Sequence, residues 1–337
     1  MRLTSIVLLV AVSVVVMFCL FSPATSFSPA QSSAQNIYDR QGLVDLMKNY
    51  LAALVAHNPK TVPFDKEVKF TENTANISVG EGLWTTASGG PTEFQIYAAD
   101  PVMQQVACLV MMKETKYGDS LVGIRLALRR GKISEAEHYV RQGLSHAMPN
   151  LQKPRPGLVE DVAPEDRTPR EQMRDIGLSY YDALIGGDGT LAPFAKECER
   201  HDDGETSVGG NRQAAGRFPA ADETTLSDLG RAVLAAPNTC EGQISAGVWG
   251  YMSAIKNRRL VVIDEQKGLA VGCSVLNHDA KLKTMKLKGI PELESVPSVQ
   301  LLFNMPSMHF FKIKKAKIYE IEDIGISVPY GTKSGWE

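Results

Sequence analysis

Ionisable side chains that could move a proton gather in the second half of the sequence. His309 alternates with the apolar Phe311 and Ile313, and alternating residues of a strand share one face. We therefore expect His309 to point inward, where an imidazole can act as a base or an acid near neutral pH. The alternative is a core histidine that is hydrogen-bonded to the backbone or to a neighbour.

The segment from Arg200 to Asp203, with the sequence Arg-His-Asp-Asp, is the densest ionisable cluster of the chain. Arg200, His201 and Asp203 are candidate catalytic residues, although strand alternation would send only two of the four side chains inward. The favoured alternative is a polar loop before the glycine that follows. The second half has more histidine and arginine near its expected pocket, and it is the half in which we expect activity.

Aromatic and acidic residues complete the candidate pockets. Tyr180 and Tyr181 are adjacent on a helical pattern and point about 100° apart, so only one of them, with Tyr180 the candidate, offers its hydroxyl to a pocket. Glu72 shares a strand face with Phe70 and has a chance of lying inside. The candidate ligand contacts are Glu72, Tyr50, Trp249 and Phe311, with packing as the alternative for the tryptophan. By contrast, Arg125 and Arg129 are expected to face solvent, as is His278.

Periodicity predicts the elements that position these residues. Apolar residues recur every three or four positions over 43–56 and again over 173–184, which predicts two amphipathic helices. Each half then ends in a predicted hairpin. The paired strands are 121–129 with 132–140 in the first half, and 309–313 with 317–321 in the second.

A proline-rich linker divides the chain. Residues 149–169 contain five prolines, which disfavour a long regular element because each fixes φ and removes a donor. The expected domains are therefore residues 37–148 and 170–337, after an export segment at 1–34.

The two halves repeat the same order of short motifs. Each has its helix, then Pro-Phe-x-Lys-Glu, then Gly-x-Trp, then strands, and the closing strands read GKISEAE and AKIYEIE. The offset between matching pieces grows along the chain, so the second half carries insertions. The tail at 329–336, PYGTKSGW, has no counterpart in the first half and is expected either to cover a pocket or to pack along the sheet.

In these motifs the chain resembles the nuclear transport factor 2-like, or SnoaL-like, superfamily. The resemblance implies an α+β fold of two tandem cone-shaped domains, each a curved, mostly antiparallel sheet packed on helices. Two unrelated α+β domains are the alternative. Proteins of this fold often pair through their sheets, so the two domains are expected to pair within one chain.

The resemblance also implies chemistry without a cofactor. Enzymes that look like this move a proton inside a dry cone, with a carboxylate or histidine as the acid or base. The expected function is a lyase or isomerase acting on a small organic substrate. The alternative is a non-catalytic ligand-binding or structural protein of the same fold, because fold alone does not decide function.

The first residues indicate export. A basic residue, Arg2, precedes an uncharged run at 6–21, and small residues follow, as in a secretory signal. The run is about 16 residues, just under the usual range for a membrane span, so a cleaved signal is favoured over an anchor. The protein is therefore expected to be secreted or periplasmic. Outside the cytoplasm Cys198 and Cys240, which flank a polar stretch, are the candidate disulfide.

Composition and motifs exclude several functions. The net charge of −2, with acids and bases interspersed, argues against a nucleic-acid partner. Cysteines and histidines lack the spacing of a zinc site, so no metal is expected. The sequence also lacks phosphate-loop and dinucleotide fingerprints, and no cofactor is expected.

Overall fold

The computed structural model of the chain describes residues 37–145, 147–210, 212, 228–291 and 293–337. The predicted export segment, residues 1–34, lies outside the described residues. Asn36–Glu337 forms one compact unit. Among the described helices, none is both long and apolar enough to cross a membrane.

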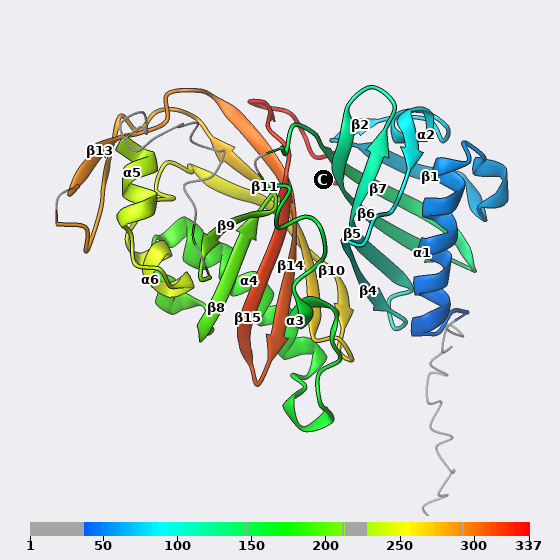
Figure 1. Cartoon of the computed structure of the whole chain (residues 1–337), viewed down its shortest axis with the longest axis horizontal. Coiled ribbons are helices and arrows are strands. Elements are labelled where there is room, and N and C mark those ends of the chain that lie inside the picture. The colour runs from blue at the N-terminus through cyan, green and yellow to red at the C-terminus, as the bar shows by residue number, and fades with distance from the viewer. Residues whose placement is uncertain (1–36, 146, 211, 213–227, 292) are drawn as a thin grey trace, which may run out of the picture. The chain divides into compact units, whose positions relative to one another are not determined.

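The first half is a long helix packed on a curved sheet (Figure 1). Helix α1 (Arg40–Val55) begins at Asp39, whose side chain accepts a hydrogen bond from the Gly42 N–H, and it buries the apolar face that the periodicity predicted. A short helix, α2 (Leu83–Thr86), precedes β3. The strands are β1 (Phe64–Glu72), β2 (Ala75–Asn76), β3 (Ala87–Gly89), β4 (Gln95–Asp100), β5 (Gln105–Glu114), β6 (Gly118–Arg129) and β7 (Lys132–Arg141).

The second half repeats this plan with additions. Helix α4 (Arg170–Gly186) packs on its sheet and ends at Gly187, which adopts a left-handed conformation (φ 58°). Two shorter helices, α5 (Asp228–Ala235) and α6 (Cys240–Ser245), follow later in the chain, after β8 and β9. The strands are β8 (Phe194–Asp202), β9 (Glu205–Val208), β10 (Ala254–Asp264), β11 (Leu269–His278), β12 (Thr284–Lys286), β13 (Ser295–Pro297), β14 (Phe303–Lys314), β15 (Lys317–Gly325) and β16 (Val328–Pro329).

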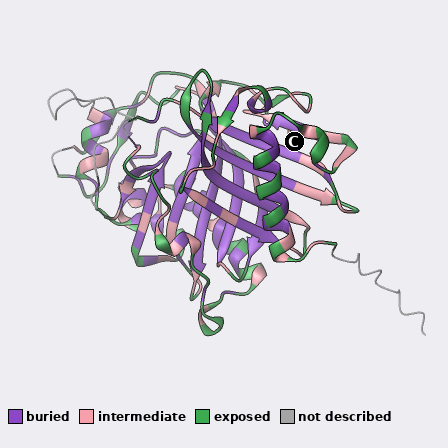
Figure 2. Cartoon of the chain, turned by 45° about the vertical axis from the view of Figure 1, so that its right-hand side comes forward, coloured by how far each residue is buried: buried purple, intermediate pink, exposed green. Residues whose placement is uncertain are grey.

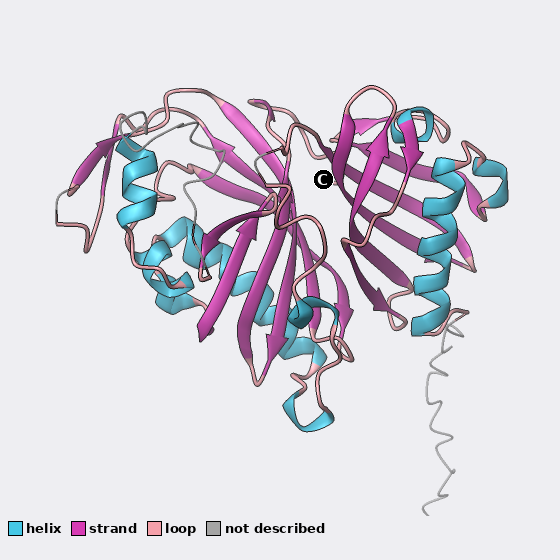
Figure 3. Ribbon diagram, viewed as in Figure 1, coloured by secondary structure: helices cyan, strands magenta, loops and turns pink. Residues whose placement is uncertain are grey.

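The two main sheets have the same strand arrangement. Within the described residues the orders are β2-β1-β7-β6-β5-β3, with β4 also on β5, and β9-β8-β15-β14-β11-β10, with β16 also on β14. Strand β1 is parallel to β7 in the first sheet, and β8 is parallel to β15 in the second. The neighbouring long strands β5, β6 and β7, and β11, β14 and β15, pair antiparallel. The same irregularity recurs at Ala127/Leu128 and at Lys312/Ile313. The α+β class, with two curved sheets on helices, is thus confirmed (Figure 3).

The predicted hairpins are present, and the linker contains only short elements. Strands β6 and β7 pair antiparallel, as do β14 and β15. In the linker the described elements are α3 (Pro156–Val159) and the 3₁₀ turn Pro164–Asp166. Arg155 fastens the linker to the second sheet, because its guanidinium donates to the carbonyl of Ile321 and to Glu322.

In the described part of the chain, three apolar clusters contain most of the buried apolar side chains, and the buried residues concentrate on the strands (Figure 2). One lies between α1 and the first sheet, and a second between α4 and the second sheet. The third joins the other faces of the two sheets, where Tyr139 of β7 shares a cluster with Met308 and Phe310 of β14. The sheets approach closely at Gly123, where a Cβ would lie 3.0 Å from Ile324 Cγ2.

Polar contacts also join the two sheets and correct one expectation. Arg125, expected to face solvent, is only 2% exposed, because the second sheet covers the face of β6 on which it lies. It pairs with Glu137, which also accepts from Arg259 of β10. Trp336 of the C-terminal tail lies over the Arg125 guanidinium at 4.7 Å and donates to Thr71 Oγ1 at 2.9 Å. The tail therefore packs against the first sheet.

Candidate functional site

Strand alternation brings four ionisable side chains to one cavity of the second half. Cys198, Arg200 and Asp202 share the α4-facing side of β8, and β15 contributes Asp323, which is paired in register with Asp202. His309 comes from β14 and is paired in register with Asp323. These side chains are 1–6% exposed.

The cavity lies between the sheet and helix α4. The space free of protein atoms is about 270 Å³, which includes space open to solvent, and about 20 Å³ of it has room for the centre of a water molecule. In this conformation it therefore holds on the order of one water. The lining combines charged groups with apolar ones, and its residues are Tyr180, Leu184, Arg200, Asp202, Trp249, Met252, Leu276, Met305, His309 and Asp323.

His309 and Asp323 form an acid–base pair. His309 Nε2 lies 3.4 Å from Asp323 Oδ2, and His309 Nδ1 lies 3.4 Å from the Tyr181 hydroxyl. The ring of Phe311 stacks parallel to the imidazole, with 5.7 Å between centroids. The imidazole is therefore held on two edges and one face, and the inward direction expected for His309 is observed.

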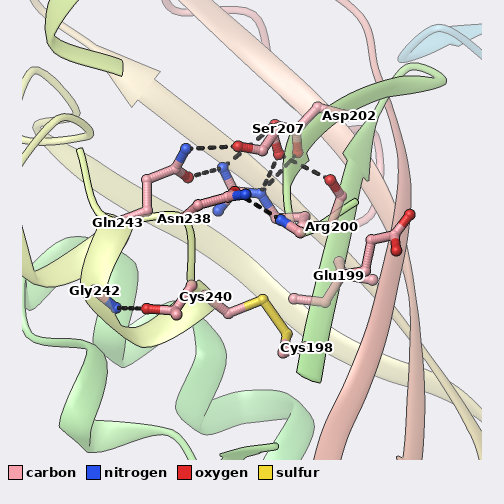
Figure 4. Close-up of a disulfide and its surroundings, with 12 residues drawn as sticks. Cys198, Glu199, Arg200, Asp202, Ser207, Asn238, Cys240, Gly242 and Gln243 are labelled. Carbon is pink, nitrogen blue, oxygen red and sulfur yellow. Dashed lines mark hydrogen bonds and ion pairs between the residues drawn. A yellow bond between two sulfur atoms is a disulfide. The ribbon is translucent and has the colours of Figure 1, made fainter. Parts of the chain in front are cut away.

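Arg200 carries the positive charge of the cavity. Its Nε lies 3.3 Å from Asp202 Oδ1, so the guanidinium and carboxylate form a buried ion pair. The guanidinium also lies over the indole of Trp249, 4.6 Å from the ring centroid. Gln243 and Ser207 accept hydrogen bonds from it, at 2.8 Å and 2.9 Å (Figure 4). These contacts fix the direction in which the Arg200 guanidinium faces the cavity.

Tyr180 supplies a neutral hydroxyl. Burial raises the pKa of Tyr180 well above its ordinary value, and Arg200 opposes this rise only in part. The phenol therefore keeps its proton and can donate a hydrogen bond. Burial likewise raises the pKa of Tyr181, whose hydroxyl approaches the imidazole rather than lining the cavity.

The structure does not bring His201 and Asp203 to this cavity. Residues 200–202 belong to a strand rather than the polar loop that was favoured, so His201 points to the opposite face. There its Nε2 lies 2.7 Å from Glu199 Oε1. Asp203 lies in the turn after β8 and accepts a hydrogen bond from the Gly325 N–H at 2.8 Å.

The other candidate ligand contacts are divided between the halves. Trp249 lines the cavity, whereas Phe311 lies behind His309 in the core. Tyr50 and Glu72 lie in the first half, where both contact His138: Tyr50 Oη is 2.9 Å from Nε2, and Glu72 Oε2 is 3.4 Å from Nδ1.

Sequence reasoning missed Asp202, Asp323 and Gln243. A signal for Asp202 was present, because a disulfide-bonded Cys198 directed into the core places Arg200 and Asp202 on the same face of a strand. Asp323 alternates with Ile321 in the same way. His278 was expected to face solvent but is buried, and its two ring nitrogens lie within 2.8 Å of backbone carbonyl oxygens.

The predicted disulfide between Cys198 and Cys240 is confirmed. It joins β8 to α6 (Figure 4), and Cys198 lies two residues before Arg200, which lines the cavity. Cys108 and Cys273 are free and buried. Among the described residues, no group of three or more His, Cys, Asp or Glu side chains is placed to hold a metal ion.

Comparisons with known proteins give a family match for the second half. Residues 166–325 match the family model described as "Domain of unknown function (DUF8021)". That stretch contains every residue that lines the cavity. No curated protein matches the sequence.

Several solved structures are similar to parts of the chain. A candidate polyketide cyclase from a Silicibacter species has 15% identity and a TM-score of 0.27, covering 47% of this chain and 90% of its own. IdmH, a candidate polyketide cyclase from Streptomyces antibioticus, has 16% identity and a TM-score of 0.26, covering 46% and 91%. PrhC from Penicillium brasilianum has 9% identity and a TM-score of 0.23, covering 47% and 82%.

Proposed function

We propose that the second-half cavity is a proton-transfer site and that the protein is a lyase or isomerase that uses no cofactor. The observation that carries this proposal is the convergence of His309, Asp323, Arg200 and Tyr180 on one buried space. A base, a cation and a neutral hydroxyl in one buried cavity are the groups that abstraction of a proton next to a carbonyl requires.

The proton acceptor is the His309–Asp323 pair. A C–H bond of the substrate breaks, the proton passes to the pair, and the electron pair stays on the substrate as an enolate. Returning the proton to another carbon gives an isomer. Donating it to a β-hydroxyl group, which then leaves as water, gives an alkene and makes the reaction a dehydration. The 3.4 Å separation of His309 Nε2 from Asp323 Oδ2 lets the imidazole and carboxylate share the added charge.

Arg200 and Tyr180 stabilise the enolate oxygen. Both are held by the protein before substrate arrives, Arg200 by Asp202, Gln243 and Trp249, so that little reorganisation accompanies the reaction. Preorganised donors of this kind contribute about 3 to 4 kcal/mol each to transition-state stabilisation in other enzymes.

The cavity favours a small, largely apolar substrate with one oxygen function. Leu184 and Leu276 supply apolar walls, and Met252 and Met305 have unbranched chains that rearrange readily. Entry of anything larger than water requires such rearrangement, because the present free space takes about one water.

The protein acts outside the cytoplasm, secreted or periplasmic, and its halves are tandem SnoaL-like domains paired through their sheets. The disulfide and the apolar N-terminal run support export. The shared strand order, the shared irregularities and the apolar cluster between the sheets support the duplication and the pairing.

Deuterium exchange tests the catalytic proposal without knowledge of the natural substrate. The full chain is incubated in D2O with ethyl acetoacetate and with an ester of 3-hydroxybutyrate, and loss of the α-proton signals is followed by NMR. We expect exchange above the buffer rate, reduced about 100-fold or more in His309→Gln and in Asp323→Asn. His201→Gln is the matched control, because His201 faces away from the cavity, and it should leave the rate unchanged.

The second candidate is a non-catalytic protein that holds a ligand or a structural water in the same cavity. The small free space favours it. Exchange at the buffer rate with every probe, or equal rates in wild type and His309→Gln, would reject catalysis and support this alternative. A metabolite that raises the melting temperature of the wild type but not of Arg200→Met would then identify the ligand-binding role.

A further inference from the structure

Two bonds join the same strand to the same short helix beside the cavity. Cys198 and Arg200 lie two residues apart on β8 and share a face, and Cys240 and Gln243 lie three residues apart on α6 and share a face. The disulfide joins the first residue of each pair, and a 2.8 Å hydrogen bond from Arg200 Nη2 to Gln243 Oε1 joins the second (Figure 4). The covalent link and the polar link are therefore neighbouring connections between one strand and one helix.

Gln243 is fully buried and uses both ends of its amide. Its Oε1 accepts from Arg200 and, at 3.4 Å, from the indole N–H of Trp249. Its Nε2 donates to the carbonyl of Ser207 on β9 at 2.8 Å. One side chain outside the cavity lining thus contacts both the cavity's cation and the indole on which that cation stacks.

Ser207 completes the support of the guanidinium. Its hydroxyl accepts from Arg200 Nε at 2.9 Å and donates to the Arg200 carbonyl at 3.1 Å. Since Nε and Nη2 are both engaged and the ring of Trp249 lies 4.6 Å away, the plane of the guanidinium is fixed. Bonds in which one partner is charged are the stronger ones, so this support is worth more than neutral contacts.

Helix α6 needs external attachment to hold Gln243 there. It has six residues, and helices shorter than about 12–15 residues are marginal in water without packing partners. Its attachments include the N-cap at Thr239, the hydrogen bond from the Gly189 N–H to Ser245 Oγ, and the disulfide at its first residue. Of these three, the disulfide is the one that leads directly to the strand carrying Arg200.

We propose that Gln243 is a positioning residue for Arg200 and that the Cys198–Cys240 disulfide holds Gln243 in register, so that reducing the disulfide releases the cation from its direction into the cavity. The inference rests on the proposed function in one respect, namely that Arg200 stabilises negative charge on the substrate. It adds a residue that touches no substrate, and it makes the site dependent on an oxidising environment. In a reducing compartment the cavity would keep its residues but lose the fixed direction of its cation.

NMR on the full chain tests this without a substrate. The readouts are hydrogen exchange of the Arg200 side-chain N–H groups, the indole N–H shift of Trp249 in a Trp84→Phe/Trp336→Phe background, and the pH titration of the His309 ring. In Gln243→Leu, which keeps the shape but removes both polar ends, Arg200 N–H exchange should rise at least about tenfold, as expected on losing a charge-assisted hydrogen bond. The Trp249 and His309 signals should move with it.

Conservative and unrelated variants separate positioning from mere stability. Gln243→Glu keeps an acceptor for Arg200 and should restore slow exchange. Cys198→Ser/Cys240→Ser, or reduction of the wild type with a phosphine, should reproduce Gln243→Leu. Leu51→Ala in the first-half core is the matched control for lost stability, and it should leave all three signals in place.

Each outcome decides the inference. Unchanged Arg200 exchange in Gln243→Leu overturns the positioning role, and unchanged signals after reduction overturn the role of the disulfide. The same shifts in Leu51→Ala would also overturn it, because a general loss of stability would then explain them. If the serine double variant does not fold, the Gln243 variants still decide the first part and reduction of the folded wild type decides the second. Failure of the deuterium-exchange assay leaves these NMR readouts intact, so the two proposals fail separately.

Discussion

The two halves place different side chains at equivalent positions of the same strand arrangement. In the first half, Glu72 of β1 pairs in register with His138 of β7. At the equivalent position of the second half, Asp202 of β8 pairs with Asp323 of β15. Two residues earlier, the first half has Phe70 where the second has the guanidinium of Arg200. The first half therefore replaces the cation of the cavity with an apolar ring.

The histidine also occupies a different strand in each half. In the first half, Ile124 of β6 pairs with His138 of β7, and in the second His309 of β14 pairs with Asp323 of β15. The histidine therefore lies on β7 in the first half but on β14, the equivalent of β6, in the second. In the first half His138 binds the hydroxyl of Tyr50 at 2.9 Å, and Phe70 packs on the imidazole with 4.7 Å between ring centroids. The first half closes these positions by packing.

The fold alone therefore does not supply the site. Both halves have a helix tyrosine, a histidine and a carboxylate between sheet and helix. The cavity of the second half is also lined by a cation, Arg200, and by two carboxylates, Asp202 and Asp323, on neighbouring strands. What distinguishes them is the exchange of an apolar ring for an arginine and the presence of α6 to hold it.

The largest expected effect comes from making the second half resemble the first. Arg200→Met removes the cationic partner of the buried Asp202 carboxylate and should lower the free energy of unfolding by about 3–5 kcal/mol. Phe70→Leu at the equivalent position of the first half is the matched control and should cost less than about 1.5 kcal/mol. Urea unfolding followed by circular dichroism measures both.

Adding Asp202→Asn to Arg200→Met closes a double-mutant cycle. Because the single variant leaves a buried carboxylate without this cation, the second change should recover part of the loss. Equal costs for Arg200→Met and Phe70→Leu would mean that the cavity charges are already solvated and do not differ in kind from the first-half core.

Glu137 of β7 and Glu322 of β15 are buried at equivalent positions, on the faces of the two sheets that point away from helices α1 and α4. Burial alone would raise the pKa of Glu137, but the guanidinium groups of Arg259 and Arg125 together lower it. At Glu322 burial raises the pKa, and Arg155 and His201 oppose it only in part. The carboxyl pKa at this position is thus lowered in one half and raised in the other.

Opposite pH dependences follow from these opposite shifts. Charged Glu137 stabilises the fold above the ordinary carboxyl pKa, and this contribution is lost as the pH falls through its lowered folded-state pKa. The contribution of Glu322 is present below the ordinary pKa and is lost as the pH rises through its raised folded-state value. Glu137→Gln should therefore cost about 3 kcal/mol at pH 7, with the cost shrinking in acid.

Glu322→Gln is the matched variant for this pair. It should lie within about 1 kcal/mol of wild type at pH 7 and become relatively more stable as the pH rises from 4 to 7. Unfolding free energies of both variants at several pH values provide the measurement. Parallel pH profiles for the two variants would contradict the different environments.

The parts of the site that depend on local pattern could be predicted from the sequence. Period-two alternation predicted the inward direction of His309, and the expectation of export pointed to the Cys198–Cys240 pair as a disulfide. Apolar periodicity predicted α1 and α4, because each helix buries one face on a sheet.

The remainder depends on partners that are distant in sequence. The local sequence pattern predicts that Arg125 faces solvent, and only the second sheet, which is distant in sequence, explains its burial. Gln243 likewise contacts Arg200, which lies 43 positions away in the chain. Both ring nitrogens of the buried His278 lie within 2.8 Å of carbonyl oxygens from separate segments, which no local pattern indicates. Asp203 follows Asp202 directly, but β8 ends at Asp202, so Asp203 lies in the turn and does not share the alternation of the strand.

A smaller effect is expected at the C-terminal tail, which has no counterpart in the sequence of the first half. The indole of Trp336 lies 4.1 Å from Lys69 Nζ and 4.7 Å from the Arg125 guanidinium, and it donates to Thr71. Trp336→Ala should cost about 2 kcal/mol, since each cation contributes roughly 0.5–1 kcal/mol at such a site and apolar area is exposed as well. Thermal unfolding gives the change. Tyr330→Ala, in the same tail but 48% exposed, should be nearly neutral, and equal losses would show that the tail acts without this anchor.

The smallest effect is expected at Lys312. This lysine occupies the position that Ala127 has in the first half, beside the irregularity that both sheets share. Lys312 donates to the carbonyl groups of Glu160 and Lys267, and burial lowers the pKa of this lysine from near 10.5 to about 8. The folded chain then releases a proton that the unfolded chain retains, so stability should rise between about pH 8 and 10.5. Lys312→Met should remove that rise, whereas Lys317→Met, at an exposed position on β15, should keep it. Urea midpoints at pH 7.5 and 9.5 measure the difference, and a rise of equal size in all three proteins would place its origin elsewhere than Lys312.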